Sequence, residues 1–365
     1  MQTEAQIPLI TSKVREFGID NAKSIGIVLV VFEHLVLLET KITTFIYSFH
    51  MPLFFLISGY LHKNSMSFKE AVKKDAQRLL IPYCYFYIIT FVYWFIVVFL
   101  RHRNEYHGSL LQEGIIKPFF GLLLGVGYDT SISRSINDPL WFLIALFNIR
   151  IIYQCLLQIT KNKIEYILLI TVLLVGIVMC IKYAGYDLWF SLDSAVLALP
   201  FFISGVLLKS SGIIVKLLKP KVVNFVLLLA FCLATFYLVR YNGRSDINAA
   251  IWGQNIFAFY IVGFSRTFMI IALSSLLSFI KGKLILFIAL NTLILMSVQN
   301  VLISISSFLL KALKITQPIQ LLLGQAVSVT VVVTLLALPA MYFIDRYFIF
   351  NRCKKRPLML LLYWS

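Results

Sequence analysis

The stretch FHMPLFFLISGYL, residues 49–61, places a histidine, a methionine and a proline at the head of a phenylalanine-rich run. The run is apolar enough for membrane hydrocarbon, where an ionisable side chain is costly and usually marks a functional site. Pro52 cannot donate a backbone hydrogen bond, which weakens a helix at the carbonyl of Ser48. We therefore expect a kinked, locally polar helix beside His50, facing protein or water.

The rest of the chain has the same apolar character. It has 365 residues, of which 60% are hydrophobic and only 13% charged, which is typical of an integral membrane protein. We predict an all-α, polytopic membrane helix bundle with about ten transmembrane helices, forming a single domain over residues 1–365. The expected spans are roughly 24–38, 43–62, 79–100, 139–159, 164–184, 190–208, 222–240, 254–280, 284–310 and 320–345.

The charges lie mainly in short connections between the apolar runs. Lys and Arg number 33 against 16 Asp and Glu, a net charge of +17. In a membrane protein this excess indicates cytoplasmic loops, so no nucleic-acid partner is predicted. We expect the N-terminus (1–23) and the basic tail (346–365) inside, and the connection 101–138 outside. The five scattered cysteines predict neither a disulfide framework nor a metal site.

Two histidines fall at matching positions of the first two spans. His34 and His50 are each eight residues from Ile42, so an antiparallel hairpin brings them to a similar depth. Lys23 precedes His34 by eleven positions, which places both on nearly the same helix face, about 16 Å apart along the axis. A lone intramembrane histidine is often an interhelical contact, but this combination favours a site.

Other polar side chains interrupt the apolar runs. Glu33 lies about 100° around the helix from His34, and we expect it either to pair with Arg150 or Arg266 in later spans or to take a direct role. Asp193, Arg150 and Arg266 either line a substrate path or pair with one another. Trp141, at a predicted outer boundary, either stacks on a sugar or anchors the span in the aromatic belt.

Five motifs together resemble the membrane acyltransferase-3 family. They are Asp20, Lys23 and His34 in the pattern ID-x-x-K-x10-H, then FHMPLFFLISGYL at 49–61, QRLLIPY at 77–83, PLWFL at 139–143 and ALPFFISGVLL at 198–208. The chain is similar above all to bacterial O-acetyltransferases of surface glycans and to fucose 4-O-acetylase-like members. The resemblance implies a multi-pass enzyme of the bacterial inner membrane that moves an acyl group, usually acetyl from acetyl-CoA, to a sugar hydroxyl. The acceptor would be a cell-surface polysaccharide such as O-antigen or capsule, or its lipid-linked precursor.

The resemblance also assigns residues. It implies that His34 is the family's essential histidine, that Lys23 is the basic residue before it, and that His50 and Arg78 match further motif positions. The family more often has arginine where this chain has Lys23, so the bidentate fork is lost. Many members carry a late histidine after N-T-L, where NTLILMSVQ offers Gln299.

The chemistry of acyl transfer is compatible with this assignment. A neutral imidazole suits removal of a hydroxyl proton at neutral pH, so we expect His34 to be a general base or, alternatively, a relay nucleophile. His50 orients His34, binds the thioester carbonyl or acts as a relay. The CoA phosphates need cations at the cytoplasmic face, which Lys23, Lys73, Lys74 and Arg78 can supply. Acetyl-CoA is a donor substrate, and no permanently bound cofactor or oligomeric state is predicted.

Two other functions also fit the sequence. Buried charges and broken helices mark transporters too, so an exporter of glycans or lipid-linked sugars is an alternative. A glycan polymerase would instead use the 101–138 connection, with His102 and His107, as an outer catalytic loop. Binding of acyl-CoA by the purified protein distinguishes the acyltransferase from both.

Overall fold

The computed structural model describes residues 17–35, 41–63, 67–100, 103–105, 108–212, 221–280, 282–312, 323–344 and 346, which are almost entirely helical. In this part of the chain seven helical segments are long and apolar enough to cross a membrane, or eight if one bent pair is a single span. The protein is thus an all-α, multi-pass membrane protein. His102 and His107 lie outside the described residues, and the predicted count of ten spans stays a prediction.

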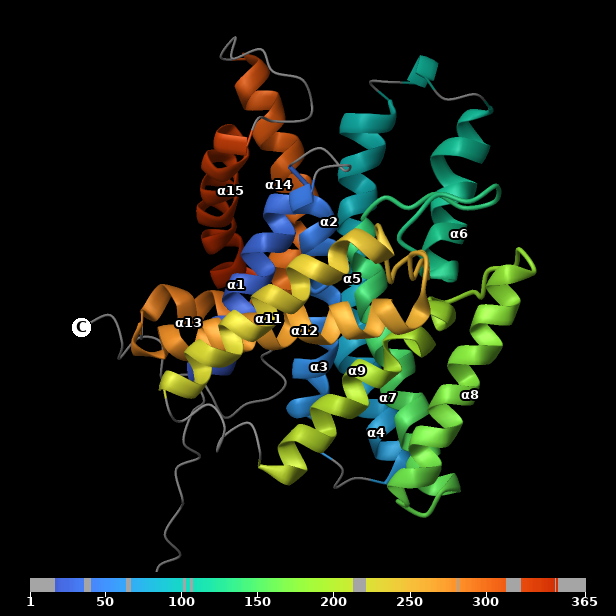
Figure 1. The fold of residues 1–365 in the computed structure, drawn as a ribbon. Coiled ribbons are helices and arrows are strands. Elements are labelled where there is room, and N and C mark those ends of the chain that lie inside the picture. Colours follow the sequence, from blue (N-terminus) through green and yellow to red (C-terminus); the bar gives the residue numbers. More distant parts are fainter. Residues whose placement is uncertain are drawn as a thin grey trace, which may run out of the picture.

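The helices follow one another without an intervening sheet (Figure 1). In chain order the elements are α1 (Phe17–Glu33), α2 (Lys41–Tyr47), α3 (His50–Tyr60), α4 (Phe68–Asp75), η1 (Ala76–Leu80), α5 (Ile81–Tyr93), η2 (Trp94–Phe99), η3 (Arg103–Glu105), η4 (Gln112–Ile116), α6 (Lys117–Leu124), η5 (Asp138–Leu140), α7 (Trp141–Ile159), α8 (Ile164–Tyr183), α9 (Leu192–Ser211), α11 (Lys221–Asn242), α12 (Ile256–Leu276), η6 (Leu277–Phe279), α13 (Lys283–Leu290), α14 (Thr292–Ala312) and α15 (Leu323–Ile344).

Helix α1 lies inside the bundle, where it packs against α3, α12, α13, α14 and α15. Its apolar side chains Ile27, Val30 and Val31 are buried. Other helices instead turn apolar side chains outward, as expected for contact with lipid rather than water. Such rows run along α8 and α15: Leu168, Leu169, Val172, Leu173, Ile177, Val327, Val331, Val332, Leu335 and Leu336.

Two glycines allow α3 and α9 to pack closely. A methyl group at Gly59 would lie 1.9 Å from the carbonyl oxygen of Phe202, and one at Gly205 would lie 2.0 Å from that of Leu56. Neither position can accept a side chain without moving a backbone, which is the use of small residues at membrane helix interfaces. This contact fixes α3, and therefore His50 at its start, relative to the rest of the bundle.

Three predicted spans differ from the observed helices. The first was expected over 24–38, but α1 ends at Glu33, and the N–H of Leu35 turns back to the carbonyl of Phe32 at 3.0 Å. The second is two helices, broken at Ser48 and Phe49, which is the break that Pro52 predicts. The ninth, expected over 284–310, bends by 85° between α13 and α14.

Candidate functional site

The break between α2 and α3 leaves backbone carbonyls at the end of α2 without partners in the helix. Arg266 of α12, only 1% exposed, donates from Nη1 to the carbonyls of Thr44 at 3.3 Å and Phe45 at 3.0 Å. It also donates to the Ser48 hydroxyl, and its guanidinium lies 4.7 Å from the centre of the Phe45 ring. A cation at a helix C-terminus is favourable, so Arg266 holds the break in place.

His50 satisfies another of these carbonyls. Its Nδ1 lies 2.9 Å from the carbonyl oxygen of Ile46, which can only accept, so Nδ1 carries a hydrogen. Its Nε2 lies 3.2 Å from Oε1 of Glu33, and both side chains are at most 3% exposed. A single proton therefore lies between Nε2 and Oε1, whichever atom holds it. The second carboxylate oxygen, Oε2, is buried without a hydrogen-bond partner.

His34 follows Glu33 in the turn that ends α1, and its side chain is half-buried. Within the described part of the chain the imidazole makes no hydrogen bond. The shared depth expected from the hairpin is consistent with the contact between Glu33 and His50. The two histidines are thus unlike: both nitrogens of His50 have partners, whereas the imidazole of His34 is available.

Sequence reasoning was wrong about the partner of Glu33. Arg150 donates instead to Asp75 at 2.6 Å and to the Ser58 hydroxyl at 3.1 Å, and Arg266 binds the carbonyls described above. The sequence did contain a signal for the true partner. An antiparallel hairpin that brings His34 to the depth of His50 also brings Glu33, the residue before His34, close to His50. Sequence reasoning assigned Glu33 to later spans because its side chain was expected to point away from His34.

The remaining candidate substrate residues have partners inside the protein. Asp193 lies 3.7 Å from Lys182 and accepts from the backbone of Ser194 at 2.8 Å, so it pairs with neither Arg150 nor Arg266. Trp141 is 5% exposed and packs on Phe55 and Phe142.

The candidate phosphate-binding cations belong to two parts of the helix packing. Lys23 is on α1 and lies 3.1 Å from Asp20. Lys73 and Lys74 are on α4 and Arg78 is on η1, elements that pack against α7. Lys73 and Arg78 are exposed, and Lys74 is half-buried.

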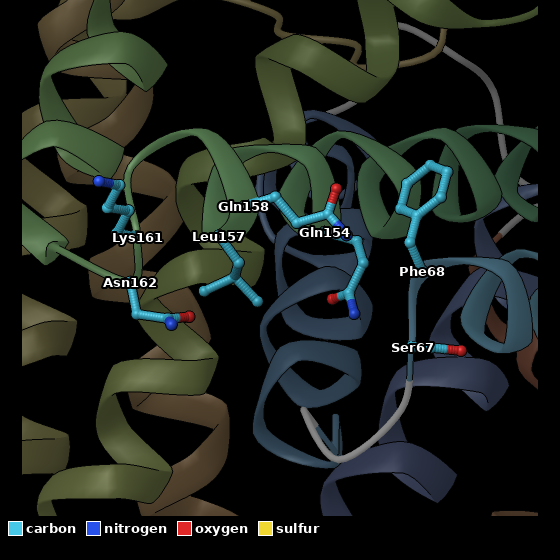
Figure 2. A pocket seen from close by; sticks show the side chains of 7 residues that line it. All are labelled: Ser67, Phe68, Gln154, Leu157, Gln158, Lys161 and Asn162. Atoms are coloured by element: carbon cyan, nitrogen blue, oxygen red, sulfur yellow. The ribbon is translucent and has the colours of Figure 1, made fainter.

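A pocket of about 440 Å³ lies between the start of α4 and the end of α7, and its lining does not include Lys73, Lys74 or Arg78. It is lined by Ser67 and Phe68 at the start of α4, by Gln154, Leu157 and Gln158 of α7, and by Lys161 and Asn162 of the following turn (Figure 2). None of these residues belongs to the pair of Glu33 and His50. The pocket lies at the C-terminal end of α7 and so marks one end of the bundle.

The structure thus brings the half-buried imidazole of His34, in sequence, next to the buried pair of Glu33 and His50, and ionisable groups within a membrane bundle are candidates for a functional site. The comparison with protein families is specific. An acyltransferase domain, that of the acyltransferase 3 family, matches residues 16–343, and the chain belongs to this family. It is therefore a membrane-bound acyltransferase, which decides against the transporter and the polymerase. A search of curated proteins found none that matches the chain significantly.

Proposed function

We propose that the protein transfers an acetyl group from acetyl-CoA to a sugar hydroxyl of a cell-surface polysaccharide, or of its lipid-linked precursor, in the inner membrane of a bacterium. The observation that carries this proposal is the half-buried imidazole of His34, which has no hydrogen bond to the described residues, next to the buried pair of Glu33 and His50. The family supplies the reaction type. The arrangement supplies a base within the membrane.

His34 is the general base in this proposal. The sugar oxygen attacks the thioester carbonyl while the imidazole takes its proton, and the imidazolium then returns that proton to the departing CoA sulfur. One ester bond forms, one thioester bond breaks, and the products are the acetylated sugar and CoA-SH. The carbonyl of Ile46 and the carboxylate of Glu33 occupy both nitrogens of His50, so His50 positions the site and shares a proton with Glu33.

The donor is held from the cytoplasmic end. Lys23 lies eleven positions before His34 along α1, a separation of about 16 Å if helical rise is continued to His34, which suits the extended arm between the phosphates and the thioester of CoA. Lys73 and Lys74 of α4 and Arg78 of η1 offer further charges to phosphate.

The test uses purified protein in proteoliposomes and comparison of cells with and without the gene. We expect saturable binding of acetyl-CoA by the protein, and loss of an acetyl ester from the surface glycan, seen by mass spectrometry and NMR, when the gene is deleted. The His34→Gln variant should insert and bind acetyl-CoA but leave the ester absent. An unchanged ester content in the deletion strain would refute the proposal.

A further inference from the structure

The short connection between α11 and α12 carries a charged pair above the buried site. The guanidinium of Arg244 lies 5.0 Å from the centre of the Tyr47 ring, and its Nη2 is 3.9 Å from Oδ2 of Asp246. The Tyr47 ring in turn meets the His50 ring edge to face, with centroids 5.3 Å apart and planes at 87°. The side chains thus form a continuous stack from Arg244 through Tyr47 to His50.

One end of this stack is exposed to solvent, and the other end contacts the buried pair of Glu33 and His50. The side chain of Arg244 is 43% exposed and that of Asp246 is 18% exposed, whereas His50 and Glu33 are at most 3% exposed. Glu33 Oε2 still needs a hydrogen-bond donor, and a hydroxyl group brought down this stack would supply one.

The connection is held rigidly rather than left as a loose loop. Asp246 and Ile251 exchange both backbone hydrogen bonds at 2.8 Å. The side chain of Asn248 accepts from the N–H of Gly127 at 3.2 Å and donates to its carbonyl at 3.0 Å, and the Ser194 hydroxyl donates to the Asn248 carbonyl at 2.8 Å. A site built on such a fixed connection loses little conformational entropy when a ligand binds.

We propose that the acceptor sugar docks at the surface formed by Tyr47, Arg244 and Asp246, above the pair of Glu33 and His50. A guanidinium offers several donors and a carboxylate several acceptors, which matches neighbouring sugar hydroxyls, and the stack beside them ends at His50, the partner of Glu33, which directly precedes His34. This inference rests on the proposed function, because it names where the sugar of that reaction binds.

The location also separates acceptor from donor. The connection is tied to Gly127, whose added methyl group would lie 2.6 Å from Trp141 at the first residue of α7, whereas the pocket of Figure 2 surrounds the last turns of that helix. The 19 residues of α7 extend about 28 Å. The proposed acceptor surface thus lies near the opposite end of α7 from the pocket, so that in this proposal the sugar and acetyl-CoA reach the histidines from opposite ends of the bundle.

The test compares Arg244→Ala, Arg244→Lys and Asp246→Asn with wild type, and uses Arg103→Ala as a control arginine outside the proposed surface. Cells expressing each variant receive labelled acetate, and acetyl ester on the native surface glycan is measured. Purified variants are tested for acetyl-CoA binding and thermal unfolding. We expect at least a tenfold loss of ester for Arg244→Ala and Asp246→Asn, partial recovery in Arg244→Lys, and acetyl-CoA affinity within twofold of wild type.

Two results would overturn the inference. Ester content within twofold of wild type in both Arg244→Ala and Asp246→Asn would show that the sugar binds elsewhere. Loss of acetyl-CoA affinity in variants that unfold normally would assign these residues to the donor. Failure of the proposed function itself has a different signature, because the wild-type strain would then carry no ester that depends on the gene.

Discussion

Glu33 at the end of α1 and His50 at the start of α3 are joined by a contact of 3.2 Å between Oε1 and Nε2. The contact fixes two helix ends relative to each other, and His34 is the residue that follows. A carboxyl group that shares a proton with an imidazole holds the orientation of that ring. The pair therefore sets the position from which His34 works.

Glu33→Gln tests this arrangement. The amide fills the same space but cannot supply the negative charge or take a proton, so we expect kcat to fall roughly 10²-fold with the KM for acetyl-CoA little changed. Steady-state kinetics in proteoliposomes measure both constants. Glu165→Gln on the exposed side of α8 is the matched control. A kcat equal to wild type would reduce the pair to a packing contact.

We expect Lys23 to contribute to acetyl-CoA binding and His34 to contribute to the chemical step. Lys23→Gln removes a contact remote from the reacting carbon, so we expect mainly a higher KM for acetyl-CoA. Lys23→Arg should retain much of the activity, because the guanidinium also binds phosphate. His34→Ala and His34→Gln should both lower kcat by roughly 10²- to 10⁴-fold with acetyl-CoA binding kept. If substitutions at both positions raised the KM for acetyl-CoA equally, both residues would contribute to binding only.

Acceptor binding should depend on the protonation of Asp246. Burial raises the pKa of this carboxyl above its usual range, against the opposing effects of the Asn248 backbone and Arg244. Its charged form is therefore lost at a higher pH than for an exposed aspartate, and we expect the KM for the sugar to rise as the pH falls through that raised pKa. Asp246→Asn should remove this pH dependence. The nearby ionisable groups Glu33, Tyr47 and Asp138 remain in both proteins.

Gly59→Ala should disturb the contact of α3 with α9. The added methyl group would lie 1.9 Å from a backbone oxygen, so a helix must shift, and we expect a loss of about 1–3 kcal/mol in the free energy of unfolding. Gly176→Ala on α8 is the control, because nothing lies within 4 Å of the added methyl group. Thermal unfolding in detergent compares them. Similar melting temperatures for both variants would mean that α3 and α9 pack less closely.

The orientation in the membrane is tested by cysteine labelling. In a background without native cysteines, a membrane-impermeant reagent added to intact cells should modify Ser109→Cys but not Ser67→Cys. Both positions are exposed in the structure, so accessibility within the protein does not limit the reaction. The reverse pattern would place the donor site and the proposed acceptor surface on the wrong sides.

Several features of the site were predictable from local sequence. Pro52 lacks an amide hydrogen, and the helix breaks where its partner carbonyl lies, at Ser48 and Phe49. The depth of the histidines follows from counting residues about the hairpin turn. The choice of partners was not predictable in this way, because it depends on how distant helices are rotated and spaced.

The sequence by itself determined that this is an all-α membrane protein of the acyltransferase class, because apolar runs can satisfy their backbone in lipid only as helices and because its motifs lie in local segments. Tertiary structure alone decided that Glu33 pairs with His50, that Arg150 pairs with Asp75, and that Arg266 holds the carbonyls of α2. It also brought Arg244 over Tyr47, nearly two hundred residues away. Buried charges take the partners that helix packing brings within a few ångströms, and that packing is set by the whole chain.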